Sequence, residues 1–385
     1  MSIRVFFSEN LFGFQFCSTT EMDVDGKITT IGTTYEDFAE HSVELGKVEL
    51  NYDKDIFQYM SQNIVDEETG EKVGRMVLPN SRDFNFDGTA GSLPDGIIRM
   101  VYAKDDKRAR GFIQGMYQQM AVAAQGNSNS NLHDILGDSS FVGYTAIFFH
   151  LMKSIYDPGT IQKDGGTDKT ADFKIIATNI SGVIFLSWTL DCEWGISKTL
   201  PKEKESPKSF RLCRSFLTYG SFLKRKRLTI LTLAETDSYS DDGTPIEIKP
   251  TAKNKEEYWK GENCRRKRSL QQYLEMEIMG VERIKFKFVD GEEEELSRQD
   301  LLAIGLEDEK IRNRGEEIFK NMKTFLAKVL SEVQENLKVG HFCEIDFTRE
   351  HENRRENGAG KFTISYKGPI DDRVLLDEFK TAFNL

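Results

Sequence analysis

Leu228-Thr-Ile-Leu-Thr-Leu-Ala-Glu-Thr-Asp237 is an apolar, β-branched run that ends in two acids, and Glu247-Ile-Lys249 follows it beyond the turn-like segment Ser240-Asp-Asp-Gly-Thr-Pro245. Such a run predicts a buried strand. Because strand side chains alternate between two faces, Glu235 and Asp237 share one face, and Glu247 and Lys249 do the same. Folded as a β-hairpin, the segment would gather three carboxylates and one ammonium on one side.

Two interpretations of this hairpin stay open. Three carboxylates suit one or two Mg²⁺ or Mn²⁺ ions, and a nearby lysine suits a scissile phosphate, which together favour metal-dependent phosphodiester hydrolysis. Alternatively, the hairpin is a solvated surface turn, because a chain with 63 acidic residues produces acidic-x-Lys by chance, as at Asp308-Glu-Lys310. The buried strand that leads into Glu235 favours the first interpretation.

The charge of the chain is acidic overall but locally basic. The 385 residues carry a net charge of −11, which argues against unspecific wrapping of nucleic acid by the whole surface. Ten basic and two acidic residues lie between Lys198 and Arg227, and four consecutive basic residues run from Arg265 to Arg268. Because both clusters flank the acidic hairpin in sequence, they are candidates for leading a phosphate backbone toward it; the alternative is a solvated face.

The cysteine and histidine patterns exclude several classes of site. The five cysteines form no Cys-x-x-Cys pair, and the five histidines show no metal-ligand spacing, so we expect neither zinc nor Cys-His nucleophilic chemistry. Reduced thiols, the absence of a signal-peptide pattern and the absence of a long apolar run predict a nuclear or cytoplasmic protein without a membrane span.

Hydrophobic periodicity predicts one α+β domain, with mixed or antiparallel β-sheets flanked by helices. No clear linker divides the chain. The expected helices are 108–124, 144–154, 213–224, 256–279 and 316–337. The expected strands are 173–177, 183–190, 228–233, 246–248, 283–289, 342–347 and 362–366, of which the last two form a hairpin.

In this order of elements the chain resembles the DXO family of decapping exoribonucleases. The likeness rests on the strand with Glu-x-Asp, the turn, Ile-Glu-Ile-Lys249, and the helical stretch 266–281. Upstream, segments 141–157, 183–188 and 217–224 resemble the family's earlier motif regions. The resemblance covers residues 140–385; residues 1–139 are divergent, and a single DXO-like domain of residues 1–385 is expected.

The resemblance implies a protein that acts at RNA 5′ ends, whether capped, noncanonically capped or phosphorylated, with Mg²⁺ or Mn²⁺ when active. A protein partner such as a 5′-3′ exoribonuclease is also implied. Glu235, Asp237 and Glu247 would be metal ligands together with the main-chain carbonyl of Ile248, and Lys249 would orient the attacking water or the phosphate. The predicted RNA-binding residues are Thr145, Lys224, Arg225, Arg227, Arg266 and Arg268.

Three positions depart from the family pattern. Thr145 stands where the family carries an arginine, Lys224 is aligned with a glutamate, and Glu275 replaces a glutamine. The first change removes a bidentate phosphate clamp, and the second places an ammonium beside the expected cation. Glu275 could pair with Lys224, or could substitute for a lost ligand. We therefore expect RNA 5′-end recognition with weak or lost hydrolysis, and either Mg²⁺ or Mn²⁺ in an active protein or no cofactor. The alternatives are an active metal-dependent decapping enzyme or 5′-3′ exoribonuclease, and a noncatalytic protein scaffold.

Overall fold

The computed structural model describes residues 20–23, 26–33, 35–65, 72–78, 98–101, 136, 138–156, 173–188, 208–221, 224–305, 309–349 and 360–370. The helix predicted at 108–124 lies outside these residues. Two β-sheets and the helices packed on them make up the described part, so the predicted α+β class with mixed sheets is confirmed.

A 12-stranded sheet forms the body of the molecule, in the order β1-β2-β16-β15-β7-β8-β6-β10-β9-β3-β4-β5. Strands β2 and β3 from the divergent N-terminal part pair with β16 and β9 of the remainder. The bounds are β1 Thr20–Asp23, β2 Gly26–Gly32, β3 Glu49–Val65, β4 Lys72–Leu78, β5 Ile98–Val101, β6 Phe141–Tyr144, β7 Phe173–Ile180, β8 Val183–Trp188, β9 Lys208–Ser221, β10 Lys224–Thr236, β15 His341–Arg349 and β16 Gly360–Pro369.

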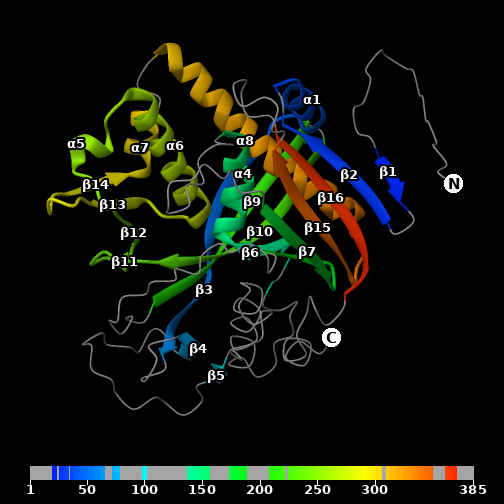
Figure 1. Ribbon diagram of the computed structural model, residues 1–385, viewed down its shortest axis with the longest axis horizontal. Helices are drawn as coiled ribbons and strands as arrows, with labels where there is room; N and C mark the ends of the chain where they lie inside the picture. Colours follow the sequence, from blue (N-terminus) through cyan, green and yellow to red (C-terminus); the bar gives the residue numbers. More distant parts are fainter. Residues whose placement is uncertain are drawn as a thin grey trace.

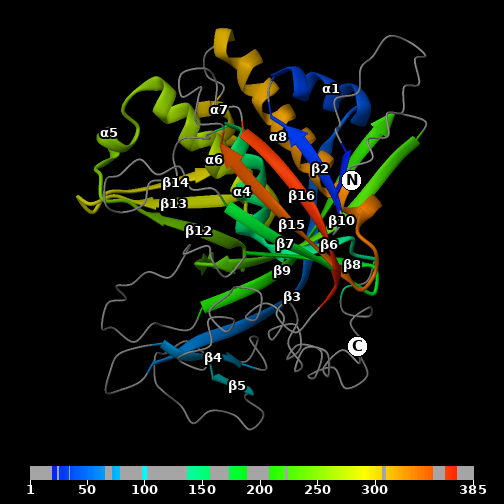
Figure 2. The same cartoon turned by 45° about the vertical axis from the view of Figure 1, so that its right-hand side comes forward.

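A 4-stranded sheet follows directly from the end of β10, in the order β11-β12-β13-β14. Figures 1 and 2 show this small sheet with α5, α6 and α7 at one end of the molecule, on the side opposite β1 and β2. The remaining bounds are α1 Tyr35–Leu45, α4 Thr145–Tyr156, β11 Ser238–Tyr239, β12 Pro245–Pro250, α5 Lys255–Tyr258, α6 Glu262–Met279, β13 Arg283–Lys287, β14 Glu293–Ser297, α7 Arg298–Gly305 and α8 Glu309–Asn336.

The core lies between the large sheet and the helices α1, α4, α6 and α8. The apolar stripe of α8, which includes Met322, Phe325 and Val329, packs in one cluster with Leu151 of α4 and Leu274 of α6. A second apolar cluster joins α6 to the small sheet through Met276, Met279, Ile284 and Phe286. Helix α6 therefore packs on both sheets. Within the described residues no helix is long and apolar enough to cross a membrane.

The helix predicted at 213–224 is wrong, because this segment belongs to strands β9 and β10. Residues 213–220 alternate strictly between buried and half-buried, which is the period of a strand. Phe216, on the less buried face, lies 3.7 Å from the Arg227 guanidinium. The apolar Phe216 beside Leu217 produced a three-and-four spacing that imitates a helix, although its aromatic ring packs against a neighbouring strand.

The helix predicted at 256–279 is split into the short α5 and the long α6. Gly261, with φ of 82°, precedes α6 in a conformation that L side chains rarely adopt. Gly280, with φ of 63°, ends α6 and donates its N–H to the carbonyl of Met276. A Cβ atom at Gly280 would lie 2.2 Å from the ring of Tyr52, so this turn also lets β3 approach the helix end.

Candidate functional site

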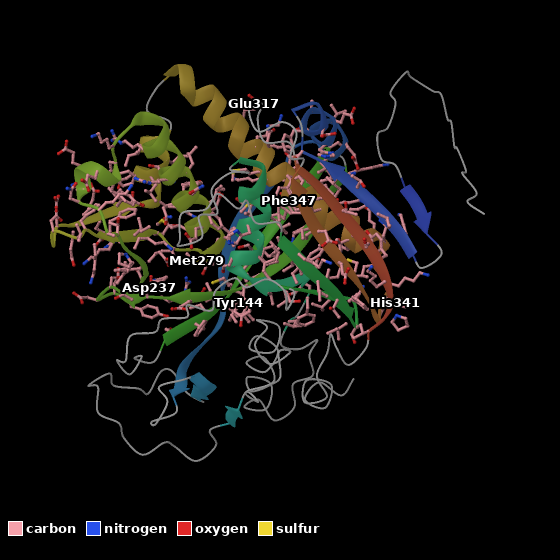
Figure 3. All side chains as sticks on the ribbon, viewed as in Figure 1. Tyr144, Asp237, Met279, Glu317, His341 and Phe347 are labelled. Carbon is pink, nitrogen blue, oxygen red and sulfur yellow. The ribbon has the colours of Figure 1, made fainter. Side chains whose placement is uncertain are left out.

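The predicted hairpin is present, but it spans two sheets. β10 ends at Thr236, Asp237 follows it, and β11 pairs with β12 across the turn 240–244. The carboxylate of Asp237 accepts a hydrogen bond of 2.8 Å from the main-chain N–H of Ile248. Figure 3 shows Asp237 on the side of the molecule that carries the small sheet. This contact ties the end of β10 to β12, where Glu247 and Lys249 lie.

Lys249 occupies the centre of the acidic residues. Its ammonium lies 2.5 Å from a carboxylate oxygen of Glu247 and 3.2 Å from one of Glu275, which projects from α6. Asp237 acts electrostatically on the same Glu247. We call Asp237, Glu247, Lys249 and Glu275 the Lys249 site. In this site, the ammonium of Lys249 forms ion pairs with the carboxylates of Glu247 and Glu275.

Burial governs the protonation of this site. Burial raises the pKa of Glu247 to about 7, against the attraction of Lys249, and the neighbouring Glu275 and Asp237 add to the rise. Burial alone would lower the pKa of Lys249, but Glu275 and Glu247 raise it above its ordinary value. Lys249 therefore stays an ammonium at neutral pH, and Glu247 is the group that exchanges a proton.

Glu235 is the last residue but one of β10 and lies on the strand face opposite Thr236, because successive strand residues point to opposite faces. Thr236 is buried, and its hydroxyl accepts a hydrogen bond of 2.7 Å from Arg211 of β9. The charged groups that act on the pKa of Glu247 include Lys249, Glu275 and Asp237. The structure brings together Asp237, Glu247 and Lys249 of the predicted hairpin and adds Glu275 from α6.

Thr145 begins α4 and is buried. Its hydroxyl donates a hydrogen bond of 3.3 Å to the carbonyl of Leu233, two residues before Glu235. It therefore links the start of α4 to the end of β10. In this position the hydroxyl is engaged by the main chain and does not replace the phosphate-clamping arginine that the resemblance implies.

Lys224 is not at this site, so its alignment with a metal-binding glutamate is wrong. It is the exposed first residue of β10, whereas Glu235 is near the last. Eleven residues of strand separate them by about 36 Å. The expected pair of Glu275 with Lys224 is likewise replaced by the pair of Glu275 with Lys249.

The basic residues that follow Lys224 lie at the same remote end and have acidic neighbours. Arg225 pairs with Glu49 at 3.1 Å, Lys226 with Glu335 at 2.7 Å, and Arg227 with Asp138 at 3.6 Å. These side chains are exposed, apart from the half-buried Glu49, so each pair stabilises the fold little. The RNA-binding role predicted for Arg225 and Arg227 stays a prediction.

The second basic cluster lies on α6, and one of its members faces the Lys249 site. The guanidinium carbon of Arg268 lies 4.6 Å from the ring of Tyr258. Burial raises the pKa of Tyr258, and the charges of Arg268, Lys249 and Glu275 all act on it. Arg268 thus contributes a second cation near Lys249. The side chain of Arg266, also on α6, lies outside the described part.

A divalent ion does not fit this arrangement of donors. Among the described residues, no group of three or more His, Cys, Asp or Glu side chains could hold a metal ion. Asp237 is engaged by the Ile248 N–H, and the Lys249 ammonium lies against Glu247 where a cation would bind. The predicted ligand set of Glu235, Asp237, Glu247 and the Ile248 carbonyl is therefore not assembled as a cation shell.

The sequence did not predict the role of Arg211, a buried residue whose hydrogen bonds connect the strands and the helix that carry the Lys249 site. Arg211 on β9 is completely buried and forms hydrogen bonds with Asp55, Thr236 and the carbonyl of Met279. These contacts join β3, β9, β10 and the end of α6. In the sequence Arg211 is one of ten basic residues in a charge run, and nothing local to it indicates that it is buried.

Several solved structures share this arrangement of two sheets and helices, which identifies the fold as DXO-like. They are Rai1 proteins of yeasts. Rai1 of Scheffersomyces stipitis has a TM-score of 0.55 and 11% identity, covering 88% of this chain and 94% of that one. The same protein in complex with (3′-NADP)⁺ and calcium gives a TM-score of 0.53 at 11% identity, with 88% and 97% covered.

Rai1 of Candida albicans, solved in complex with pU5 and Mn²⁺, gives a TM-score of 0.54 at 10% identity over 88% of this chain and 96% of that one. No protein-family model matches the chain, and no curated protein matches its sequence. At this level of identity the likeness establishes the fold alone. The predicted resemblance to the DXO family is confirmed in that respect.

Replacing Glu247 by glutamine is expected to change the pH dependence of stability. The folded pKa of about 7 exceeds the ordinary value of 4.5, so the stabilisation linked to this group is complete below pH 4.5 and is lost as pH rises through 7. That loss is about 3 kcal/mol. Glutamine does not titrate, so the stability of Glu247→Gln relative to wild type should rise between pH 4.5 and 8.

Urea unfolding at four pH values in this range measures the difference. Glu317→Gln is the control, because Glu317 is exposed on α8 and lacks the burial that perturbs Glu247. A stability difference for Glu247→Gln that stays constant from pH 4.5 to 8 would contradict the protonation of Glu247 near neutrality.

Proposed function

We propose that this protein binds RNA 5′ ends at the Lys249 site and has weak or no hydrolytic activity. One observation carries the proposal: the ammonium of Lys249 lies between the carboxylates of Glu247 and Glu275, where a divalent ion would be needed for hydrolysis. The site supplies the ammonium of Lys249 as a fixed cation for a phosphate. The same ammonium occupies the position that a catalytic divalent metal ion would need.

The RNA 5′ end is favoured as ligand by the fold and by an arginine that lies over an aromatic ring near Lys249. The Rai1 structures that share the fold were solved with pU5 and with (3′-NADP)⁺, both of which carry phosphate groups. In this chain the Arg268 guanidinium lies over the ring of Tyr258, and the charge of Lys249 also acts on Tyr258. Cations next to an aromatic ring suit a nucleotide, whose phosphate is charged and whose base stacks.

Two features of the described residues support weak hydrolysis. Lys249 offsets one of the two negative charges of Glu247 and Glu275, so less negative charge remains to attract Mg²⁺ or Mn²⁺. Thr145, at the position of the family's arginine, is hydrogen-bonded to the main chain and does not clamp a phosphate. Loss of such electrostatic stabilisation typically reduces turnover by orders of magnitude.

A paired assay on the wild-type protein tests this proposal. RNAs with 5′-triphosphate, 5′-monophosphate, conventional cap and NAD cap are incubated with Mn²⁺ or with EDTA, and both binding and product release are followed. We expect binding that depends on the 5′ group, persists in EDTA and leads to no product above background.

Other outcomes of the assay select the alternatives. Product that requires Mn²⁺ and disappears in Glu247→Ala would make the protein an active decapping hydrolase and overturn the proposed loss of activity. If the protein bound all the RNAs equally regardless of the 5′ group, or bound none of them, the result would favour a noncatalytic protein scaffold. We propose a nuclear or cytoplasmic location from the cysteine pattern, and a 5′-3′ exoribonuclease as partner stays a prediction.

A further inference from the structure

A polar stripe on α6 faces the Lys249 site. Arg268, Gln271, Gln272 and Glu275 are spaced by three and four residues and therefore share one helix face. The neighbouring faces are apolar: Leu270, Leu274 and Ile278 pack in the main core, and Met276 and Met279 pack against the small sheet. Because Glu275 pairs with Lys249, the stripe points between the two sheets, toward the end of β12.

Three of the four side chains on this stripe carry a buried polar atom that has no hydrogen-bond partner. These atoms are Nη1 of Arg268, Nε2 of Gln271 and Oε1 of Gln272. Buried polar atoms are nearly always paired in folded proteins, so three adjacent exceptions call for an explanation. The residues themselves are half-buried, and rotation of their flexible side chains can bring these groups to a ligand.

Arg268 has the properties of an anion-binding residue. Its guanidinium lies against the ring of Tyr258, and the described residues place no ion pair on it. Tyr258 in turn is fixed by edge contacts with Trp259, at 4.8 Å, and by the tilted ring of Phe286, at 5.3 Å. A desolvated guanidinium whose orientation is held by an aromatic platform is suited to bind a phosphate group through two parallel hydrogen bonds.

Gln271 and Gln272 offer both donors and acceptors. A side-chain amide presents an NH₂ group and a carbonyl oxygen, which together match the polar edge of an unstacked nucleobase. A phosphate-binding arginine next to two amides therefore matches a nucleotide, in which a phosphate and a base edge lie a few ångströms apart.

We propose that the polar stripe of α6 recognises the terminal nucleotide of the RNA 5′ end, with Arg268 binding its phosphate and with Gln271 and Gln272 hydrogen-bonding to its base. The inference rests on the proposed function, and it assigns specificity to residues outside the hairpin. Binding would give the unpaired polar atoms hydrogen-bond partners. The free energy of these hydrogen bonds would then contribute to the affinity for the ligand.

The test uses pentamer RNAs that differ only in the 5′ group or in the first base, with fluorescence anisotropy as the readout. Arg268→Met should weaken binding of the 5′-monophosphate RNA about 30-fold and leave the 5′-hydroxyl RNA unchanged. The double variant Gln271→Leu/Gln272→Leu should reduce the difference in affinity between RNAs starting with different bases about 5-fold.

Thermal unfolding separates recognition from a structural role. Leucine has nearly the volume of glutamine and carries no unpaired polar atom, so the double variant should have a Tm about 2 °C above that of wild type while binding more weakly. Thr324→Val is the matched control: Oγ1 of Thr324 is also buried and unpaired, but it lies on α8. This variant should gain stability and keep wild-type binding.

The outcomes distinguish the inference from the proposed function. Wild-type protein that fails to distinguish 5′-monophosphate from 5′-hydroxyl RNA overturns both. Wild-type discrimination that persists in Arg268→Met and in the glutamine variant overturns the role of the stripe alone, and so does a loss of binding that Thr324→Val reproduces.

Discussion

Lys249→Met is expected to raise the affinity of this protein for Mn²⁺ by on the order of 100-fold. In the wild-type protein the Lys249 ammonium lies against Glu247 and Glu275, so an incoming divalent ion meets a positive charge. Two unit charges about 4 Å apart repel by about 4 kcal/mol near a protein surface, and the doubly charged ion feels more. Methionine keeps the length of the side chain and removes the charge.

The variant should also release a proton when it binds the metal. Without the ammonium, Glu247 remains buried beside Glu275 and Asp237, which favours its protonated form even more than the pKa of about 7 in the wild type. Mn²⁺ then displaces this proton. Isothermal titration calorimetry at pH 7 in two buffers of different ionisation enthalpy gives both the affinity and the number of protons released.

Lys255→Met is the matched control for this experiment. Lys255 also bridges two glutamates, Glu292 at 3.2 Å and Glu294 at 3.1 Å, but it lies in an exposed position on α5. Water screens those charges, so its removal should change Mn²⁺ affinity by less than about twofold. Equal Mn²⁺ affinities of wild type and Lys249→Met would refute the role of Lys249 as the resident cation.

The strands that carry strong apolar or alternating patterns could be predicted from the sequence. β7, β8, β12, β13, β15 and β16 lie where periodicity indicated them, and the β15–β16 hairpin is confirmed. Strand β9 could not be predicted from the sequence, because Phe216 gives both faces of that strand an apolar character. The order of the 12 strands could not be predicted either, since the paired residues of β3 and β9 lie 147 to 169 positions apart in the sequence.

At the site, the contact between residues of one strand could be predicted from the sequence, but the contacts between residues of different elements could not. The sequence showed that Glu247 and Lys249 share a strand face, and their contact follows from this. It did not show that Lys249 rather than Lys224 meets Glu275, because that depends on how α6 lies across the small sheet. The hydrogen bond from Thr145 to the Leu233 carbonyl of β10 could not be predicted either. It forms because β6, which directly precedes Thr145, pairs in parallel with β10.

Arg211→Ala is expected to destabilise the fold by about 4 kcal/mol, because it removes a fully buried charge together with its hydrogen bonds to Asp55, Thr236 and Met279. Arg211 contacts Asp55 at 3.0 Å, the Thr236 hydroxyl at 2.7 Å and the Met279 carbonyl at 2.9 Å. The last contact satisfies an orphan carbonyl at the end of α6. Urea unfolding measures the loss, and Arg211→Lys should recover part of it by keeping the charge beside Asp55.

Arg214→Ala is the control, because Arg214 lies on the same strand and pairs with Asp53 of the same neighbouring strand, but at the surface. Its removal should cost about 1 kcal/mol or less. The two variants should differ in function as well. Thr236 lies between Glu235 and Asp237, and Met279 ends the helix that bears Glu275, so loss of Arg211 releases both sides of the Lys249 site. Weaker binding of RNA 5′ ends by Arg211→Lys than by Arg214→Ala, measured below the unfolding transition, would identify Arg211 as a positioning residue; equal binding would limit its role to stability.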